Sequence, residues 1–386
     1  MKILFLDQSG NLGGAELCLL DVVRSYCDRP HSCLVGLFQE GPFRVCLEQH
    51  QIPVQILATQ ELSVRKESGV FQGLQSIGPL LRLVQRILRL SRDYDLIYAN
   101  TQKALVAGAI ASWGSRRPLV YHLHDILSIE HFSRTNLRLA ITLANQFASL
   151  ILANSQATKQ AFIQAGGQAS RVHVVYNGFQ PEPYQNLTES ASHLKQQLQL
   201  EDKFVVGHFS RLSAWKGQHI LLQALTACPE DVVALFVGDA LFGEEDYVQY
   251  LQQQVQALQL QDRVHFLGFR SDVPPLMAAC NLVAHTSTAP EPFGRVIVEA
   301  MLCGTPVVAA AAGGAVELVN HGQTGWLTPP GDASKLAEVI HHCYQHRDDS
   351  QAIADRAQME VRQRFHLKAT NRQIETLLQQ LSSDRC

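Results

Sequence analysis

The sequence predicts an α/β protein made of two doubly wound, Rossmann-like domains. At 386 residues the chain is too long for one ordinary hydrophobic core. Short apolar runs alternate with segments of helical periodicity, and this alternation lapses once, in a polar stretch near the middle. We therefore expect a first domain at residues 1–180, a linker at 181–201 and a second domain at 202–365. A final helix, at about residues 366–386, is expected to pack back on the first domain.

The expected strands are short and apolar and alternate with helices, which is typical of a parallel sheet covered on both faces. In the first half they lie at Lys2–Asp7, Cys33–Phe38, Val54–Ala58, Leu96–Ala99, Leu119–Leu123, Leu150–Ala153 and Val172–Tyr176. In the second half they lie at Phe204–Phe209, Val232–Val237, Val264–Leu267, Leu282–His285 and Val307–Ala310. Such sheets bind ligands beyond the carboxyl ends of their strands, so we expect both domains to face one central cleft.

Composition narrows the class of protein further. A hydrophobic content of 46% with 17% charged residues allows well-buried sheets and argues against a disordered chain. The net charge of −3 gives no reason to expect nucleic acid as a partner. Nine cysteines without a Cys-x-x-Cys pair or a Cys/His cluster at zinc spacing indicate reduced thiols and no metal site. The first apolar run is too short for a signal peptide and none is long enough to span a membrane, so we expect a cytoplasmic protein.

One stretch of the second half, residues 289–300, combines two carboxylates with a helix start. Glu291 lies in a loop bracketed by prolines, Gly294 follows, and the helix expected at Arg295–Cys303 carries Glu299 about one turn inside. Unpaired backbone N–H groups at a helix start suit an anion. The stretch therefore indicates a site for a sugar phosphate or nucleotide. Spacing alone leaves a capped helix with two solvated glutamates equally open.

Three other motifs also allow two interpretations, a ligand-binding role or a purely structural one. Arg211 and Lys216 lie on a loop between a strand and a helix and suit a diphosphate, or are ordinary surface cations. Gly13 and Gly14 follow the first strand and open the first helix, where bare backbone can approach a phosphate, although a plain tight turn fits as well. His124 ends a strand, where it can bond to a substrate or serve as a structural histidine.

A basic amphipathic segment at residues 79–92 is a candidate membrane contact. Arg82, Arg86 and Arg89 adjoin an apolar stripe, which we expect to consist of Ile77, Leu81, Val84 and Leu88. Such a helix either lies peripherally on an anionic membrane surface or covers a sheet with its charged face in water.

The ordered motifs of the second half resemble a known family. Glu291-Pro-Phe-Gly and Glu299 are followed by Ala300-Met301-Leu302-Cys303-Gly304-Thr305-Pro306, by Gly313-Gly314 and by Gly325-Trp326-Leu327-Thr328-Pro329-Pro330-Gly331-Asp332. This string is similar to family four of the retaining nucleotide-sugar glycosyltransferases, "glycosyl transferases group 1", which have the GT-B fold. The resemblance is strong over about residues 200–335. It is weaker in the first half, where Gly13-Gly14-Ala15-Glu16, His124-Asp125 and Asn154-Ser155 fit.

The resemblance implies metal-independent transfer of a sugar from a nucleotide-diphosphate donor, without a cofactor and with retention at the anomeric carbon. It assigns roles to residues that match the family's motifs. Arg211 and Lys216 would neutralise the departing diphosphate, helped by backbone near Gly14, Phe293 and Gly294. Glu299 would bind the ribose hydroxyls, Glu291 a hydroxyl of the donor sugar, and His124 the sugar near its sixth carbon. Arg270 would flank the base, and Gly13 and Arg295 belong to the same expected donor site.

The acceptor implied is a lipid-linked molecule or a polysaccharide or other glycan. Two alternatives stay open: an epimerase or phosphorylase on the same fold, and a nucleotide-sugar-binding protein without catalysis. The base, the sugar, the linkage and the oligomeric state do not follow from the sequence. One departure from the family is Ser210, which stands before Arg211 where glycine is usual.

Overall fold

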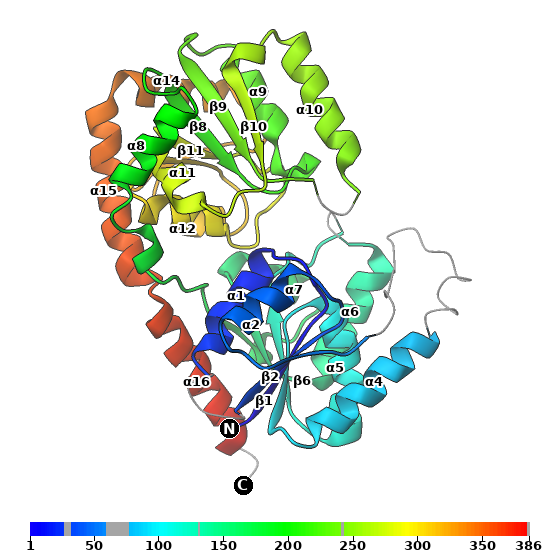
Figure 1. Ribbon diagram of the computed structural model, residues 1–386. Helices are drawn as coiled ribbons and strands as arrows, with labels where there is room; N and C mark the ends of the chain where they lie inside the picture. Colours follow the sequence, from blue (N-terminus) through cyan, green and yellow to red (C-terminus); the bar gives the residue numbers. More distant parts are fainter. Residues whose placement is uncertain (27–31, 59–76, 130–131, 241–242, 384–386) are drawn as a thin grey trace. The chain divides into compact units, whose positions relative to one another are not determined.

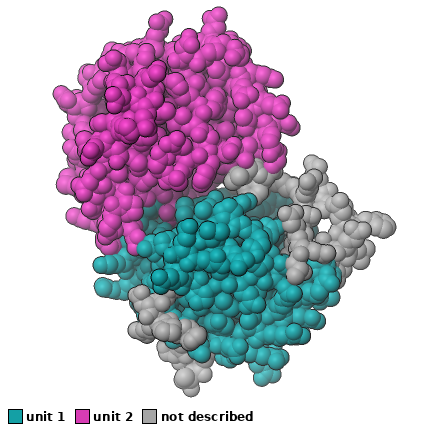
Figure 2. Space-filling view, in the orientation of Figure 1, with its two compact units in different colours: residues 1–179, 367–386 teal, residues 180–366 magenta. Residues whose placement is uncertain are grey.

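The computed structural model describes residues 1–26, 32–58, 77–129, 132–240 and 243–383, and the chain divides into two compact units. The first unit consists of residues 1–179 and 367–386, and the second of residues 180–366 (Figure 2). Each is an α/β unit with one wholly parallel sheet, as the alternation of strands and helices predicts.

The first unit contains a seven-stranded sheet in the order β3-β2-β1-β4-β5-β6-β7. Its strands are apolar runs of three to six residues, and most of them are buried on both sides, as parallel sheets require. They are β1 (Ile3–Asp7), β2 (Cys33–Leu37), β3 (Val54–Ile56), β4 (Leu96–Ala99), β5 (Leu119–Leu123), β6 (Ala148–Ala153) and β7 (Val172–Val174).

Two sets of helices cover the faces of this sheet (Figure 1). One hydrophobic cluster joins α4 (Ile77–Ser91), α5 (Gln102–Ser115), α6 (Arg134–Phe147) and α7 (Gln156–Gln164) to one face. A second cluster joins α1 (Gly14–Arg24), α2 (Pro42–Gln49) and α16 (Leu367–Ser383) to the other. α16 places Ile374 and Leu378 in that cluster, and its Asn371 donates from Nδ2 to the carbonyl of Asp21. The final helix therefore completes the core of the first unit.

The expected apolar stripe of α4 is partly wrong. Leu83, Val84 and Ile87 are the apolar residues that α4 buries, whereas Leu81 is 57% exposed. The helix packs chiefly against α5, which selects the face centred on Leu83 and Ile87. The helical periodicity of the sequence extends over Leu74–Arg92, and residues 74–76 of that segment lie outside the described residues.

The second unit contains a six-stranded sheet in the order β10-β9-β8-β11-β12-β13. Its strands are β8 (Phe204–Phe209), β9 (Val232–Val237), β10 (Val264–Gly268), β11 (Leu282–His285), β12 (Val307–Ala310) and β13 (Trp326–Thr328). Its helices are α8 (Thr188–Gln197), α9 (Gln218–Leu225), α10 (Glu245–Ala257), α11 (Val273–Ala279), α12 (Arg295–Leu302), α13 (Ala315–Leu318), α14 (Ala333–Gln345) and α15 (Arg347–Arg364). α9, α10 and α14 share one hydrophobic cluster with the sheet, and α12 contacts β11 and β12.

The segment 181–201, expected as a linker, lies inside the second unit. It contains α8, which buries Ala191 and Leu194 and packs against α11. Because the segment is mostly polar, the apolar face of α8 was not recognised from the sequence. Throughout the described part of the chain, no helix is long and apolar enough to cross a membrane.

Candidate functional site

Both sheets reverse their strand order at one point, and most of the expected site residues follow the strands that flank it. In the second unit the reversal lies between β8 and β11. The loop after β8 carries Arg211 and Lys216, and the loop after β11 carries Glu291. Parallel strands end at one edge of the sheet, so these two loops meet at the position where doubly wound sheets bind ligands.

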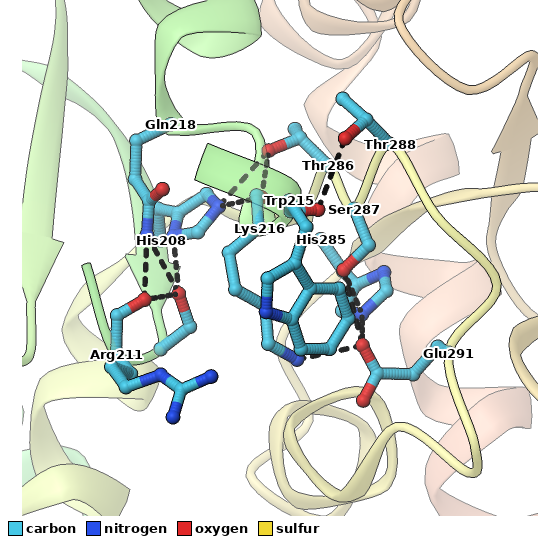
Figure 3. A network of polar contacts seen from close by, with 11 residues as sticks. His208, Arg211, Trp215, Lys216, Gln218, His285, Thr286, Ser287, Thr288 and Glu291 are labelled. Atoms are coloured by element: carbon cyan, nitrogen blue, oxygen red, sulfur yellow. Dashed lines mark hydrogen bonds and ion pairs between the residues drawn. The ribbon is translucent and has the colours of Figure 1, made fainter. Parts of the chain in front are cut away.

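Lys216 and Glu291 form an ion pair at this edge. Lys216 Nζ lies 2.7 Å from Glu291 Oε2, and the two side chains are only 15% and 11% exposed. Oε2 also accepts from His285 Nε2 at 3.0 Å and from Ser287 Oγ at 3.1 Å (Figure 3). Among the described residues, no contact is made to the second carboxylate oxygen, Oε1, which is not sealed from solvent. One oxygen of Glu291 is therefore held by the protein and the other is available to a ligand.

The contacts of Glu291 also fix its charge. Burial by itself would raise the pKa of the carboxyl, but the Lys216 ammonium and the bond from His285 outweigh burial and hold this pKa well below its usual range. Glu291 is therefore ionised at neutral pH. A carboxylate in this state accepts hydrogen bonds from hydroxyl groups and does not serve as a general acid.

The loop that carries both cations is held by buried polar groups. Gln218 is fully buried and donates from Nε2 to Ser210 Oγ and to the carbonyl of Arg211, both at 2.9 Å. Ser210 Oγ donates to the same carbonyl at 2.9 Å. Ser210 thus adds a bond that glycine would lack.

Gly217 closes this loop in a conformation that excludes a side chain. Its φ is +71°, and a Cβ there would lie 2.0 Å from the carbonyl oxygen of Thr286. Thr286 Oγ1 donates to the carbonyl of Gly217 at 2.8 Å and contacts His208 Nε2 at 3.0 Å. Burial lowers the pKa of His208 to about 3, so its ring is neutral. This close approach joins the loop after β8 to the loop after β11.

These contacts predict unequal effects for Ser210 and Gln218. Ser210→Gly removes one of two donors to the Arg211 carbonyl, so we expect a loss of about 0.5–1.5 kcal/mol in the free energy of unfolding. Gln218→Leu removes the bonds to both Ser210 Oγ and the Arg211 carbonyl, which keeps only the bond from Ser210, so we expect a larger loss of about 1–3 kcal/mol. Urea unfolding of both variants measures the difference. Equal stability of the two variants would contradict this account of the loop.

Two further expected site residues, Arg211 and Arg270, each pair with an acidic side chain. Arg211 Nε lies 3.3 Å from Glu244 Oε2, and Ser213 Oγ donates to the other oxygen of Glu244. Arg270 follows β10 and forms a bidentate pair with Asp272, at 2.8 Å from Nε to Oδ1 and 2.6 Å from Nη2 to Oδ2. The structure thus places Arg211 on the same loop as Lys216, and Arg270 beyond the edge strand of the sheet.

The start of α12 presents backbone and not side chains. The ring of Phe293 is buried against Phe365, at 5.8 Å between centroids, so this residue offers only its main chain. Gly294 has φ +97° and caps the helix. Arg295 Nε lies 3.4 Å from Glu299 Oε1 one turn along.

The loop that carries Glu291 lies in close contact with Gly313 and Gly314, which follow β12. The N–H of Gly314 donates to the Glu291 carbonyl at 2.6 Å. A Cβ at Gly313 would lie 2.2 Å from the same oxygen, so this approach requires glycine.

In the first unit, the strand order reverses between β1 and β4. Asp7 ends β1, Asn100 follows β4 and His124 follows β5. Asn100 donates from Nδ2 to Asp7 Oδ2 at 2.7 Å, and its Oδ1 lies 2.9 Å from His124 Nε2. The ring of His124 is 3.9 Å from that of His122, on the same side of the strand as alternation predicts. These contacts place His124 beside buried polar groups.

Gly13 and Gly14 lie at the start of α1, as expected. The carboxyl group of Glu16, in the first turn of the helix, lies close to Gly13, because a Cβ added at Gly13 would be only 2.7 Å from Glu16 Oε2. Burial and the nearby Asp7 raise the pKa of Glu16 to about 8, and burial raises the pKa of Asp7 to about 6. The first unit therefore holds a carboxyl group that is largely protonated at neutral pH.

This raised pKa predicts a pH-dependent effect of Glu16→Gln. A carboxyl group whose pKa is raised in the folded state destabilises that state as pH rises from its unfolded pKa, near 4.5, through about 8. The amide of the variant stays neutral, so the variant and the wild type should unfold alike near pH 4.5. At pH 8 we expect the variant to be more stable by about 1–3 kcal/mol. Urea unfolding at both pH values tests this, with the exposed Glu40→Gln as a control that should show no such trend. Greater wild-type stability at pH 8 would contradict it.

Sequence reasoning missed several residues of these clusters: Asp7, Asn100, His208, Glu244, His285 and Ser287. All of them except Glu244 share one signal, a polar residue at the carboxyl end of a buried apolar strand or within two residues of it. Across the described residues, no group of three or more His, Cys, Asp or Glu side chains is arranged to hold a metal ion. A cavity of about 570 Å³ in the second unit is lined by Tyr184, Lys195, Cys303 and Arg362 among others, and by none of the expected site residues.

Comparisons with known proteins agree with this geometry. The family "Glycosyl transferases group 1" matches residues 190–360, and "Glycosyltransferase Family 4" matches residues 12–182. The chain belongs to the group 1 glycosyltransferases. Its two Rossmann-like units are those of the GT-B fold, as the motif string indicates. The crystal structure of Anabaena HepE in complex with UDP-glucose is 58% identical in sequence, covers 98% of this chain and 100% of that one, and superposes with a TM-score of 0.91.

Curated relatives of this glycosyltransferase are more distant. N-acetyl-alpha-D-glucosaminyl L-malate synthase of Bacillus anthracis is 29% identical over 53% of this chain and 53% of its own length. The capsular polysaccharide biosynthesis glycosyltransferase CapM of Staphylococcus aureus is 24% identical over 82% of this chain and 83% of its own. The chain thus spans about half the length of the first of these relatives.

Proposed function

We propose that this glycosyltransferase transfers glucose from UDP-glucose to a lipid-linked or polysaccharide acceptor, with retention at the anomeric carbon and without a metal ion. The observation that carries the proposal is the Lys216–Glu291 pair at the reversal point of the second sheet, with Glu291 Oε1 left for a ligand hydroxyl. The Anabaena protein with bound UDP-glucose, at 58% identity, favours uridine and glucose.

The chemistry suits this arrangement. Cleavage of the bond between sugar and phosphate builds negative charge on the diphosphate, and preorganised cations stabilise such charge. Lys216 and Arg211 supply two cations on one loop, and the start of α12 adds backbone donors around Gly294. Glu291 would bind a hydroxyl of the sugar, and Glu299 would bind the hydroxyls of the ribose. Arg270 would flank the base.

Retention in this scheme does not use a pair of carboxylates as acid and nucleophile. Glu291 is kept ionised by Lys216, so it has no proton to give to the leaving group. We propose attack by the acceptor on the same face from which the diphosphate leaves, with the departing phosphate taking the acceptor's proton.

The test begins with ligand binding. Thermal shift with UDP-, GDP- and ADP-glucose should show the largest stabilisation with UDP-glucose, since a bound donor stabilises the folded state by mass action. NMR of the products from a glycan acceptor should then show the same anomer as the donor, with a rate unchanged by EDTA. Epimerised UDP-sugar, or sugar phosphate released from a glycan by phosphate, would favour the epimerase or phosphorylase. Binding without transfer or hydrolysis would favour a non-catalytic protein.

We also propose peripheral contact with an anionic membrane, which suits a lipid-linked acceptor. The helices α4 and α5 pack together, and their exposed sides carry Leu81, Ile110 and Trp113, of which Trp113 is 76% exposed. Arg82 and Arg89 are exposed on α4. Apolar and aromatic side chains next to arginines are typical of helices that lie in a membrane interface.

Liposome sedimentation tests this contact. We expect binding to vesicles with anionic lipid at low salt, less binding at high salt, and loss of binding in Trp113→Ser. Equal binding to zwitterionic vesicles, or none to anionic ones, would rule out the proposed membrane contact.

A further inference from the structure

Three polar side chains at the reversal point of the first sheet form a continuous hydrogen-bonded chain. Asp7 and Asn100 are 0% and 1% exposed. Asp7 Oδ1 accepts from the N–H of Ser9 at 2.8 Å, and Oδ2 accepts from Asn100 Nδ2 at 2.7 Å. Asn100 Oδ1 lies 2.9 Å from His124 Nε2. Buried polar chains of this kind fix the orientation of each member.

The orientation of the Asn100 amide follows from its neighbours. Its Nδ2 faces the carboxylate of Asp7 and, at 3.1 Å, the carbonyl oxygen of Ala15. Both are acceptors, and a carbonyl oxygen cannot act in any other way, so the amide nitrogen must point towards them. The amide oxygen therefore faces His124.

An amide oxygen can only accept, so the contact with His124 requires a proton on Nε2. In a neutral imidazole the other nitrogen, Nδ1, then carries the lone pair. The neighbouring ring does not compete for this role. His122 accepts or donates at Nδ1 to the Tyr98 hydroxyl at 2.8 Å, and burial lowers the pKa of His122 to about 3, which keeps it neutral.

We propose that Asp7 and Asn100 are positioning residues that hold the imidazole of His124 in one orientation with its proton on Nε2. The inference rests on the proposed function only for its consequence, which is that His124 meets the sugar donor in a single tautomer. A ring whose proton could sit on either nitrogen would lose part of its population to the wrong form.

The experiment follows the tautomer directly, by ¹⁵N NMR of the full chain with labelled histidine at a pH where the ring is neutral. The His124 signals are assigned by their loss in His124→Gln. We expect the wild type to carry its proton on Nε2. Asn100→Leu removes the acceptor and should give a mixture of tautomers. Asn100→Asp, which shares one proton with Asp7 so that the two carboxyl groups stay bonded, keeps an acceptor facing Nε2 and should keep the single form. Asp7→Asn, which leaves Asn100 in place, should move the signal less than Asn100→Leu does.

Kinetics of the same variants provide the functional measurement. We expect Asn100→Leu to lower kcat of transfer by about 10–100-fold with a smaller change in the KM of the donor. Tyr98→Phe, which removes the bond to His122 one ring away, is the matched control. It should leave the His124 tautomer and kcat of transfer nearly unchanged, because the bond that it removes lies outside the chain from Asp7 through Asn100 to His124.

The outcomes separate this inference from the proposed function. A wild-type proton on Nδ1, or a tautomer unchanged in Asn100→Leu, would overturn the inference even in a fully active enzyme. Wild-type protein that transfers no sugar from any nucleotide donor would contradict the proposed function, while the NMR result would still decide the tautomer. If Asn100→Leu fails to fold, Asp7→Asn and Asn100→Asp provide the comparison.

Discussion

Lys216→Met should lower kcat/KM for UDP-glucose by about 10³-fold, comparable to the loss of a transition-state donor in other enzymes. The ammonium lies at the reversal point of the second sheet, and within residues 210–217 only Arg211 carries a second positive charge. The substitution keeps the length and apolar stem of the side chain while removing its charge. We therefore expect weaker inhibition by UDP as well, measured by steady-state kinetics and calorimetry.

Lys203→Met is a matched control for this change. Lys203 belongs to the same unit but not to the described site, so its replacement should leave kcat/KM within about twofold, as surface substitutions usually do. Unchanged UDP affinity in Lys216→Met would show that the ammonium does not meet the diphosphate.

Glu291→Gln should be the second most damaging change, with a loss of about 10²–10³-fold in kcat/KM. The amide keeps the shape of the carboxylate, but Lys216 and His285 lose a charged acceptor. Breaking a largely buried ion pair should also lower the free energy of unfolding, by about 3 kcal/mol. Kinetics and urea unfolding measure the two effects, with Glu201→Gln as a control outside the site.

Deoxy analogues of UDP-glucose, one for each hydroxyl, identify what Glu291 holds. The wild type should be slowed most by the analogue that lacks the hydroxyl bound by Oε1, and Glu291→Gln should be slowed less by that same analogue. If every analogue is slowed equally in the two proteins, Glu291 does not contact the sugar.

Most strands could be predicted because parallel strands are apolar on both faces, so runs such as Leu96–Ala99 are recognisable without any partner. The three-residue edge strand β13 (Trp326–Thr328) was not predicted. The face of α4 could not be predicted in the same way. The apolar residues of that helix, from Leu80 to Leu90, cover about half of its circumference. Packing against α5 selects Leu83 and Ile87 for burial and leaves Leu81, at the edge of this arc, exposed.

The candidate site was predictable where chemistry is concentrated in a short motif. Glu291, Gly294 and Glu299 share one loop and helix, and Arg211 and Lys216 share another loop. His285 and Ser287 were missed although they bond Glu291 from the same stretch of chain, six and four residues away. The Asp7–Asn100 pair was not predictable, because its contact depends on which strands become neighbours in the sheet. Asp7 and Asn100 are 93 residues apart in the chain and meet only because β1 pairs with β4.

The position of α16 in the chain has a consequence for synthesis. The first unit needs Ile374 and Leu378 to cover a face of its sheet, but residues 180–366 leave the ribosome before them. Until then, the part of this face that Ile374 and Leu378 cover stays exposed to solvent. The second unit needs no such late segment. The N-terminal unit should therefore finish folding last, in contrast to the usual order of translation.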